Sequence, residues 1–187
     1  WGAERLTAHD AANGKILWSC AGFNPQKKNN WVVVSSFVKA GDMAVVPYGR
    51  GSKLAGIRLG GKGDVTESHR AWETEASSFV PTPAAHGGRV YIVRDRGEVL
   101  CTDPKTGQTI WQGALPKDRA SYYSSPSIGD GKLYAAREDG TVYVAQIEGE
   151  FKVLSENFMG ERIIASPVPV NSRLLLRGEK HLYCIKP

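Results

Sequence analysis

The sequence of 187 residues lacks any apolar run long enough to cross a membrane. A membrane-spanning helix needs ~18 or more consecutive apolar residues, whereas no unbroken aromatic and aliphatic stretch here is longer than that of residues 31–34. No stretch of about ten residues keeps the 3.6-residue apolar period of an amphipathic helix. These absences argue against a membrane-spanning helix in this segment and predict a chain with almost no helix.

Recognisable groupings of reactive side chains are also scarce. The three cysteines, Cys20, Cys101 and Cys184, include no adjacent pair and no metal-binding spacing. The four histidines have neither metal-ligand spacing nor an evident nucleophile beside them. Residues 56–63 nearly spell a phosphate-binding loop, but Gly63 replaces the Ser or Thr that would hold Mg²⁺. We therefore assign no catalytic, cofactor-binding or metal-ligating residue.

The excess of positive charge is small and dispersed. There are 24 Lys and Arg against 19 Asp and Glu, a formal net charge of +5. Basic and acidic residues are interleaved along the chain, which is typical of a solvated surface. The charge pattern thus favours no nucleic-acid partner.

What the sequence does contain is a repeated hairpin. Residues 99–111 read Val-Leu-Cys-Thr-Asp-Pro-Lys-Thr-Gly-Gln-Thr-Ile-Trp. The side chain of Asp103 can accept hydrogen bonds from backbone amides ahead of it, and Gly107 can take the positive φ that closes the turn. Residues 6–18 repeat Asp, Gly and Trp in the same register. Both stretches are predicted to be antiparallel hairpins that end in a large aromatic residue.

The hairpin recurs with a period. Degenerate copies start at residues 6, 54, 99, 142 and 182, which are 48, 45, 43 and 40 residues apart. A second signature alternates with it, a Ser or Thr followed by Pro: Thr82-Pro83, Ser125-Pro126 and Ser166-Pro167, with a version lacking Pro at Ser36. Each period therefore holds two hairpins, or four strands. Four-stranded units repeating every ~40–45 residues are the blades of a β-propeller.

The sequence thus predicts an all-β fold, a β-propeller of four-stranded antiparallel blades. About four blades are expected here, as part of a seven- or eight-bladed ring. The single propeller segment, 1–187, divides into the end of a blade, three blades and an incomplete blade: 1–19, 31–73, 79–112, 122–155 and 163–187. Since the chain opens with a third and a fourth strand and ends with a third, we interpret it as the C-terminal half of a longer protein. By itself, it is expected to form an open arc.

The pattern Asp-x-x-x-Gly-Lys/Gln-x-x-Trp resembles the tryptophan-docking motif of the quinoprotein-like (PQQ-like) propeller repeats, including the BamB-like ones. The resemblance implies that Trp18, Trp72 and Trp111 dock between neighbouring blades, where an indole buries a large area and its N–H can find a carbonyl. The repeat that starts at Val142 departs from the pattern, with Leu154 where Trp is expected. That junction should be less well anchored.

The resemblance also implies two functions. The first is a non-catalytic, extracytoplasmic scaffold or protein-binding module of the BamB-like type, periplasmic or secreted in a bacterium, with a role in outer-membrane assembly and an unidentified protein partner. The alternative is part of a PQQ-dependent alcohol or sugar dehydrogenase. Such enzymes hold PQQ against a Trp and a disulfide of adjacent cysteines, with Ca²⁺ close by. Because this segment has no such cysteine pair, their site would lie mostly in the missing half.

One recurrence suggests a partner-binding face. Three arginines each stand five residues before a third strand, and the loops that lead into the blades carry aromatic residues. In propellers, the turns between second and third strands share a face with those loops. Arginine and aromatic residues are enriched at protein-binding surfaces. The predicted face consists of Trp31, Phe79, Arg94, Tyr122, Tyr123, Arg137 and Arg177. The alternative is that each arginine pairs locally, with an acid such as Asp95 or Glu138.

Overall fold

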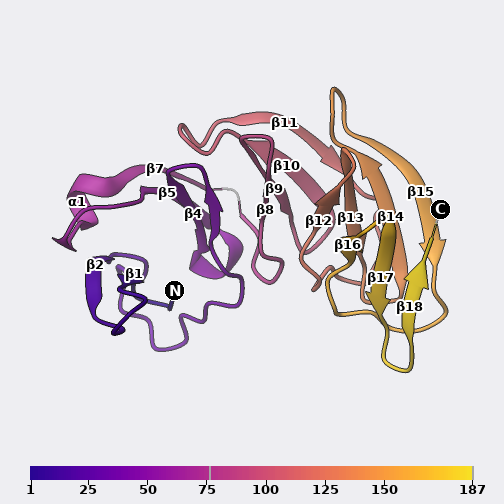
Figure 1. The fold of residues 1–187 in the computed structure, drawn as a ribbon, viewed down its shortest axis with the longest axis horizontal. Coiled ribbons are helices and arrows are strands. Elements are labelled where there is room, and N and C mark those ends of the chain that lie inside the picture. Colours follow the sequence, from indigo (N-terminus) through magenta and orange to yellow (C-terminus); the bar gives the residue numbers. More distant parts are fainter. Residues whose placement is uncertain (76, 187) are drawn as a thin grey trace.

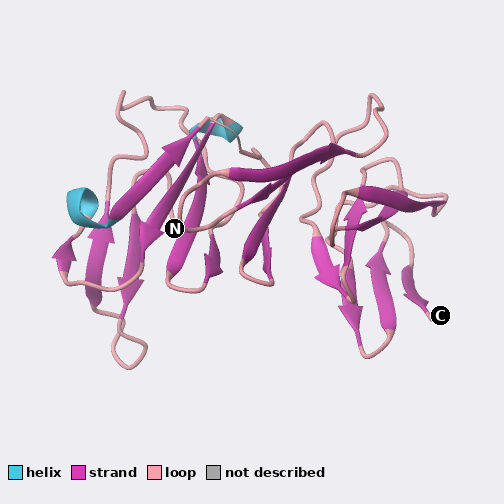
Figure 2. Cartoon of the chain, turned by 90° about the horizontal axis from the view of Figure 1, so that it is seen from above, coloured by secondary structure: helices cyan, strands magenta, loops and turns pink. Residues whose placement is uncertain are grey.

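The structure is a computed structural model that describes residues 1–75 and 77–186. Five β-sheets follow one another along an arc, and the first and last sheets lie at opposite ends of it (Figure 1). The described helices are one short α-helix, α1 (Thr66–His69), and one 3₁₀ turn, η1 (Gly49–Gly51), so nearly all regular structure is strand (Figure 2). The predicted all-β fold with antiparallel blades is confirmed.

Three sheets are complete four-stranded blades, in which neighbouring strands are antiparallel. The first contains β3 (Val38–Ala40), β4 (Met43–Tyr48), β5 (Lys53–Arg58) and β7 (Arg70–Thr74). The second contains β8 (Ala84–His86), β9 (Arg89–Val93), β10 (Glu98–Thr102) and β11 (Thr109–Ala114). The third contains β12 (Ser127–Gly129), β13 (Lys132–Ala136), β14 (Thr141–Gln146) and β15 (Lys152–Phe158).

The two end sheets have three strands each. The N-terminal sheet contains β1 (Leu6–His9), β2 (Ile16–Cys20) and β6 (Gly63–Asp64). The C-terminal sheet contains β16 (Val168–Val170), β17 (Arg173–Arg177) and β18 (Leu182–Ile185). Among the described residues, no strand pairs with the outer edge of β18.

Apolar residues are buried mainly between successive sheets. One cluster joins Tyr91 and Cys101 of the second complete blade to Leu133 and Tyr143 of the third. Successive side chains of a strand point to opposite faces of its sheet. One set therefore packs against the preceding sheet and the other against the next. The core of this fold is therefore a series of layers between blades.

The Ser/Thr-Pro signature joins the blades by hydrogen bonds. The amide of Ser36 donates to Oγ1 of Thr82 at 2.9 Å, that of Thr82 to Oγ of Ser125 at 3.0 Å, and that of Ser125 to Oγ of Ser166 at 2.9 Å. These residues precede the innermost strands, β3, β8, β12 and β16, which neighbour one another along the arc. The signature thus forms a ladder from one blade to the next.

Two local features differ from simple repetition. The apolar residues 31–34 lie in a loop and not in a strand. The glycine-rich loop at residues 60–64 contains β6, which pairs in parallel with β2 through Trp18–Gly63 and Ser19–Asp64. This loop therefore extends the N-terminal sheet and fastens it to the first complete blade.

Candidate protein-binding face

The turn at residues 103–107 has the hydrogen bonds that its Asp and Gly predict. Oδ1 of Asp103 accepts hydrogen bonds from the amides of Lys105 and Thr106, at 2.7 and 3.1 Å. The amide of Gly107 donates to the carbonyl of Asp103 at 2.9 Å, and its φ is +74°. The Asp of the motif shapes the turn, and the Gly closes it.

Trp72 connects two blades through such a turn. Its Nε1 donates to the carbonyl of Pro104, in the next blade, at 2.8 Å. Its ring lies between two glycines: a Cβ on Gly56 would come within 2.1 Å of the ring, and a Cβ on Gly107 within 2.5 Å. The glycine of the motif therefore also provides the space that an indole from the preceding blade occupies.

Trp111 occupies the equivalent position in the next blade, where its contacts are with aromatic rings. Its ring packs against Tyr91 and Phe151, with ring centroids 5.9 and 5.6 Å away. Its buried Nε1 has no hydrogen-bond partner in the part of the chain that the structure describes. The indole is held there by packing alone.

Trp18 is buried in the cluster that joins the first two sheets. Its strand, β2, pairs with β6, and this pairing places Gly63 beside Trp18. Each of the three tryptophans predicted to dock is therefore found at a junction between sheets.

The prediction for Leu154 is wrong by one residue. Wherever a third strand pairs with a fourth strand, the pairing contains one β-bulge. The bulge adds one extra residue to the fourth strand. Ala8 pairs with Trp18, Gly56 with Trp72, and Cys101 with Trp111, whereas Val144 pairs with Ser155. Leu154 is the extra residue of its bulge. Ser155 stands at the tryptophan position.

The predicted partner-binding face has a common structural basis. The turns between second and third strands hydrogen-bond to the loops that lead into the blades: the amide of Phe79 donates to Oδ2 of Asp95 at 2.9 Å, and that of Ser121 to Oε1 of Glu138 at 3.0 Å. The carbonyl of Asp95 also accepts from the amide of Tyr122 at 3.0 Å. Turns and loops therefore share one face.

Two of the predicted residues do not reach that face's surface, because Tyr122 and Arg137 are buried. Arg137, only 5% exposed, pairs with Asp139 at 2.8 Å and donates to the carbonyl of Pro116 at 3.2 Å. Its hydrogen bonds to Asp139 raise the pKa of the guanidinium. This arginine stabilises its own blade, and it is removed from the predicted face together with Tyr122.

The other two arginines also make local contacts. Nε of Arg94 donates to the carbonyl of Ser77 at 3.0 Å. Arg177 is exposed and donates to the carbonyl of Gly178. Tyr123, in the loop that leads into the third complete blade, is half-buried. Of the predicted set, Trp31, Phe79, Arg94, Tyr123 and Arg177 retain some exposure.

A residue that the sequence pattern did not single out completes part of this face. The guanidinium of Arg50 lies 5.2 Å from the ring centroid of Phe79, and Nζ of Lys28 lies 5.3 Å from that of Trp31. Arg50 has a positive φ of 57° in η1, and it also donates to the carbonyl of Asn30 at 3.4 Å. Its place in an irregular turn, outside the five-residue spacing of the other arginines, gave no repeated signal.

Exposed aliphatic residues lie beside these two cation–aromatic pairs. Val32 and Val34 are exposed, and together with Arg50 and Phe79 they border a crevice too narrow to hold a water molecule. We define the basic–aromatic patch as Lys28, Trp31, Val32, Val34, Arg50 and Phe79. It combines large rings, aliphatic surface and positive charge.

A cluster of hydrogen bonds around the Glu161 carboxylate joins the loop before the C-terminal sheet to the β17–β18 turn and to β18. The Glu161 carboxylate accepts hydrogen bonds from the Tyr183 hydroxyl at 2.6 Å, from the Lys180 amide at 2.5 Å and from Nδ1 of His181 at 2.9 Å. These donors, the Tyr183 hydroxyl first among them, hold the pKa of Glu161 at about 2. All three contacts of this cluster are made to the carboxylate, and the lowered pKa indicates that they favour its ionised form.

Comparison by sequence finds no significant match: no protein-family model matches the chain, and no curated protein does. None of the described helices combines the length and the apolar character that crossing a bilayer requires.

Solved structures do match. BamB from Moraxella catarrhalis is 15% identical with a TM-score of 0.66, and the alignment covers 92% of this chain and 52% of BamB. The computationally designed Ika8 protein is 11% identical with a TM-score of 0.73, covering 98% of this chain and 52% of Ika8. A europium-containing methanol dehydrogenase is 12% identical with a TM-score of 0.55, covering 68% of this chain and 25% of that enzyme.

This chain therefore spans about half the length of BamB and of Ika8. At such low identities, the matches show fold and nothing about activity. Together with the repeated Asp, Gly and Trp hairpins and the arc of four-stranded blades, they show that the chain has the fold of the BamB-like, quinoprotein-like (PQQ-like) β-propellers.

Proposed function

We propose that this chain is part of a non-catalytic scaffold or protein-binding module that acts outside the cytoplasm, in the manner implied by its BamB-like fold. The observation that carries the proposal is the basic–aromatic patch. Its two cation–aromatic pairs, Arg50 with Phe79 and Lys28 with Trp31, lie on the face where loops and turns of successive blades meet.

The patch has the composition of a protein-binding hot spot. Tryptophan, tyrosine and arginine are enriched among the residues that dominate the energetics of protein interfaces, and the contacts around them exclude water. Here Val32 and Val34 provide exposed aliphatic surface beside the rings. The positive charge of Lys28 and Arg50 favours a partner with an acidic surface.

The alternative, a quinone-dependent dehydrogenase, would need residues that hold a quinone and a calcium ion. Among residues 1–75 and 77–186, no three His, Cys, Asp or Glu side chains are grouped so that they could hold a metal ion. The three cysteines are far apart in the sequence. We assign no residue of this segment to a quinone or calcium site.

Site-specific photo-crosslinking tests the proposal. A photoreactive phenylalanine analogue is placed at Val32, in the patch, and at Ile16, which is exposed on β2 outside it (48% and 61% exposed). In an extracytoplasmic extract of the source organism, the probe at Val32 should give a discrete protein adduct, and the probe at Ile16 should not. The substitution Arg50→Glu should abolish the adduct, because it reverses the charge and removes the contact with Phe79.

Two results would overturn the proposal. Equal crosslinking from both positions, or crosslinking that Arg50→Glu leaves unchanged, would show that the patch selects no partner. Saturable binding of pyrroloquinoline quinone in the presence of Ca²⁺, measured by calorimetry, would favour the dehydrogenase instead.

A further inference from the structure

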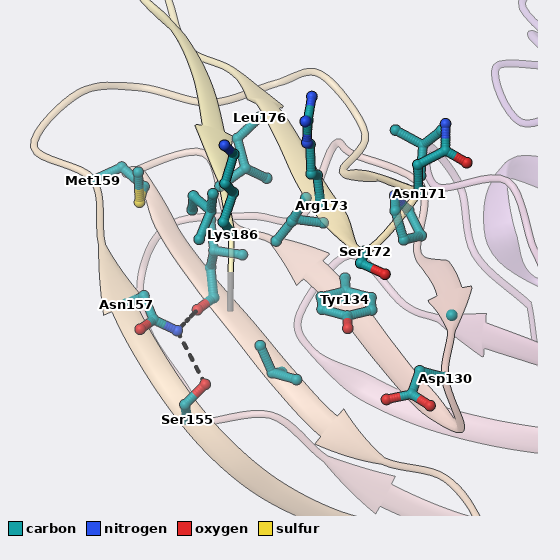
Figure 3. Close-up of a pocket in the computed structure, with 17 residues that line it drawn as sticks. Asp130, Tyr134, Ser155, Asn157, Met159, Asn171, Ser172, Arg173, Leu176 and Lys186 are labelled. Carbon is teal, nitrogen blue, oxygen red and sulfur yellow. Dashed lines mark hydrogen bonds between the residues drawn. The ribbon is translucent and has the colours of Figure 1, made fainter.

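The groove between the third complete blade and the C-terminal sheet lies at the open edge of the arc, where no described strand follows β18 (Figure 3). Polar groups on its β15 side satisfy one another, since Nδ2 of Asn157 donates to Oγ of Ser155 at 3.0 Å and to the carbonyl of Val142 at 3.3 Å. Nothing among the described residues indicates what covers this groove. Residues 31–34, within the basic–aromatic patch, differ in this respect.

Residues 31–34, Trp-Val-Val-Val, have the side-chain pattern of a β-strand without a neighbouring strand. Val32 and Val34 are exposed, whereas Trp31 and Val33 are half-buried, so burial alternates from one residue to the next. An extended backbone produces this alternation when one of its faces lies against the protein. Valine, with its β-branched side chain, favours that conformation. The segment is therefore extended, although it pairs with no described strand.

The segment is held in place at both ends. The indole Nε1 of Trp31 donates to the carbonyl of Phe23 at 2.5 Å. At the other end, the amide of Ser35 donates to the carbonyl of Phe79 at 3.3 Å, and its carbonyl accepts from Nε1 of Trp1 at 3.2 Å. Between these ends, one side of the segment borders the narrow crevice against β4. A partner therefore meets a segment that is already ordered, which lowers the entropy cost of binding.

The backbone of the segment has hydrogen-bonding groups that the described chain does not use. The amides of the first two residues donate to carbonyls of the preceding loop. The amides of Val33 and Val34, and the carbonyls of residues 31–34, bond to no described residue. A row of such N–H and C=O groups on an extended segment is a template for another strand. In strand addition, main-chain hydrogen bonds provide affinity and alternate side chains provide specificity.

Positive charge lies at the N-terminal end of the segment. Arg50 donates to the carbonyl of Asn30 at 3.4 Å, and Nζ of Lys28 lies 5.3 Å from the Trp31 ring centroid. An antiparallel partner, the more stable arrangement per residue, would place its C-terminal end beside these cations. In a second copy of this chain, the residues at that end would be 35–38, Ser-Ser-Phe-Val, which include no acid. The charge therefore favours a different protein with acidic residues at this place.

We propose that residues 31–34 hold the partner protein by accepting an extended segment of it as an antiparallel β-strand. The bound segment alternates aliphatic and polar residues, so that its aliphatic side chains pack beside Val32 and Val34. Its C-terminal end is acidic and lies next to Lys28 and Arg50. This inference rests on the proposed function and deepens it by naming the conformation and chemistry of what the patch binds.

The test uses the whole chain and a synthetic peptide with blocked ends, Thr-Val-Thr-Val-Thr-Glu-Glu. Calorimetry should show saturable binding with a dissociation constant below about 1 mM. Methylation of the peptide's backbone nitrogens from its second to its fifth residue keeps every side chain and removes the donors, so it should weaken binding at least about tenfold. Arg50→Glu should also weaken binding at least about tenfold. Arg96→Glu, the same charge change in the equivalent turn of the next blade, should leave the affinity unchanged.

Amide hydrogen exchange reports the strand pairing directly. The amides of Val33 and Val34 should exchange rapidly in the free chain, because they have no described partner. Saturating peptide should slow one of the two at least about tenfold, since successive amides of a strand point to opposite edges.

The inference is overturned if the peptide does not bind, if the methylated peptide binds as well as the parent peptide, or if binding protects neither amide. It is also overturned if the chain self-associates and Val34→Lys makes it monomeric, because a second copy would then cover the segment. The proposed function is tested separately, since photo-crosslinking at Val32 detects a protein partner whatever the conformation of the part that is bound.

Discussion

The two docking tryptophans, Trp72 and Trp111, allow the value of one hydrogen bond to be measured. Nε1 of Trp72 donates to the carbonyl of Pro104 at 2.8 Å, whereas the buried Nε1 of Trp111 has no partner among the described residues. Replacement by phenylalanine keeps an aromatic ring at each position and removes the N–H. The substitutions Trp72→Phe and Trp111→Phe should therefore differ in their effect on the free energy of unfolding.

The expected difference follows from what each N–H contributes. Loss of ring volume costs both variants a similar amount, about 1–2 kcal/mol, a fraction of the ~3–5 kcal/mol for truncating a buried Trp to Ala. Trp72→Phe also loses a hydrogen bond of about 1 kcal/mol and leaves the Pro104 carbonyl without this donor. Trp111→Phe removes an unpartnered buried donor, which relieves a penalty of about 1–3 kcal/mol. Trp72→Phe should be the less stable variant by about 2–4 kcal/mol.

Urea denaturation followed by circular dichroism measures the difference. The midpoint should fall further for Trp72→Phe than for Trp111→Phe, with equal m-values, since both variants expose the same surface on unfolding. Equal destabilisation of the two variants would refute the reasoning, because it would mean that the N–H of Trp72 contributes nothing beyond packing.

Three further predictions concern contacts between blades and within the last sheet. Ser125→Ala removes the hydroxyl that accepts from the Thr82 amide, and it should lower the free energy of unfolding by about 1–3 kcal/mol in urea denaturation. Gly107→Ala should cost at least about 1 kcal/mol in the same assay, because the new Cβ would meet the Trp72 ring at 2.5 Å and the backbone φ is +74°. The pKa of Glu161 is about 2, below its ordinary 4.5, so ionised Glu161 contributes stability above pH ~4.5 that is lost as the pH falls towards 2. The melting temperature should therefore fall over this interval in the parent, and less steeply in Glu161→Gln. A parent and a variant with parallel pH profiles would contradict this role of the carboxylate.

Much of the fold followed from local chemistry. The Asp and Gly of the hairpin specify a turn through a side-chain acceptor and a positive φ, both properties of a few consecutive residues. The period of the hairpins then implied blades, because a four-stranded unit cannot bury its faces alone. The Ser/Thr-Pro signature was visible as a pattern, but its hydrogen-bonded ladder joins residues more than forty positions apart, such as Thr82 and Ser125 at a separation of 43.

The candidate face was predicted less well. Repetition identified three arginines at one spacing, but the same spacing placed Arg137 in a buried pair with Asp139. Arg50, which stacks on Phe79, stands in an irregular 3₁₀ turn that has no counterpart in the other blades as far as the structure describes them. Exposure depends on how neighbouring loops pack, and a spacing along the chain does not encode it.

The sequence by itself determined the repeating unit, the turn chemistry and the tryptophans at three junctions. Only the tertiary structure decided which residue of the last full blade faces the next sheet. One extra residue in a β-bulge changes the side of the sheet on which every following side chain lies. In a degenerate repeat, the sequence does not reveal which residue is the extra one of the bulge. The sequence pattern therefore assigned the tryptophan position to Leu154, whereas the strand pairing assigns it to Ser155. The strand pairing settles this because the backbone hydrogen bonds fix which residues face each other.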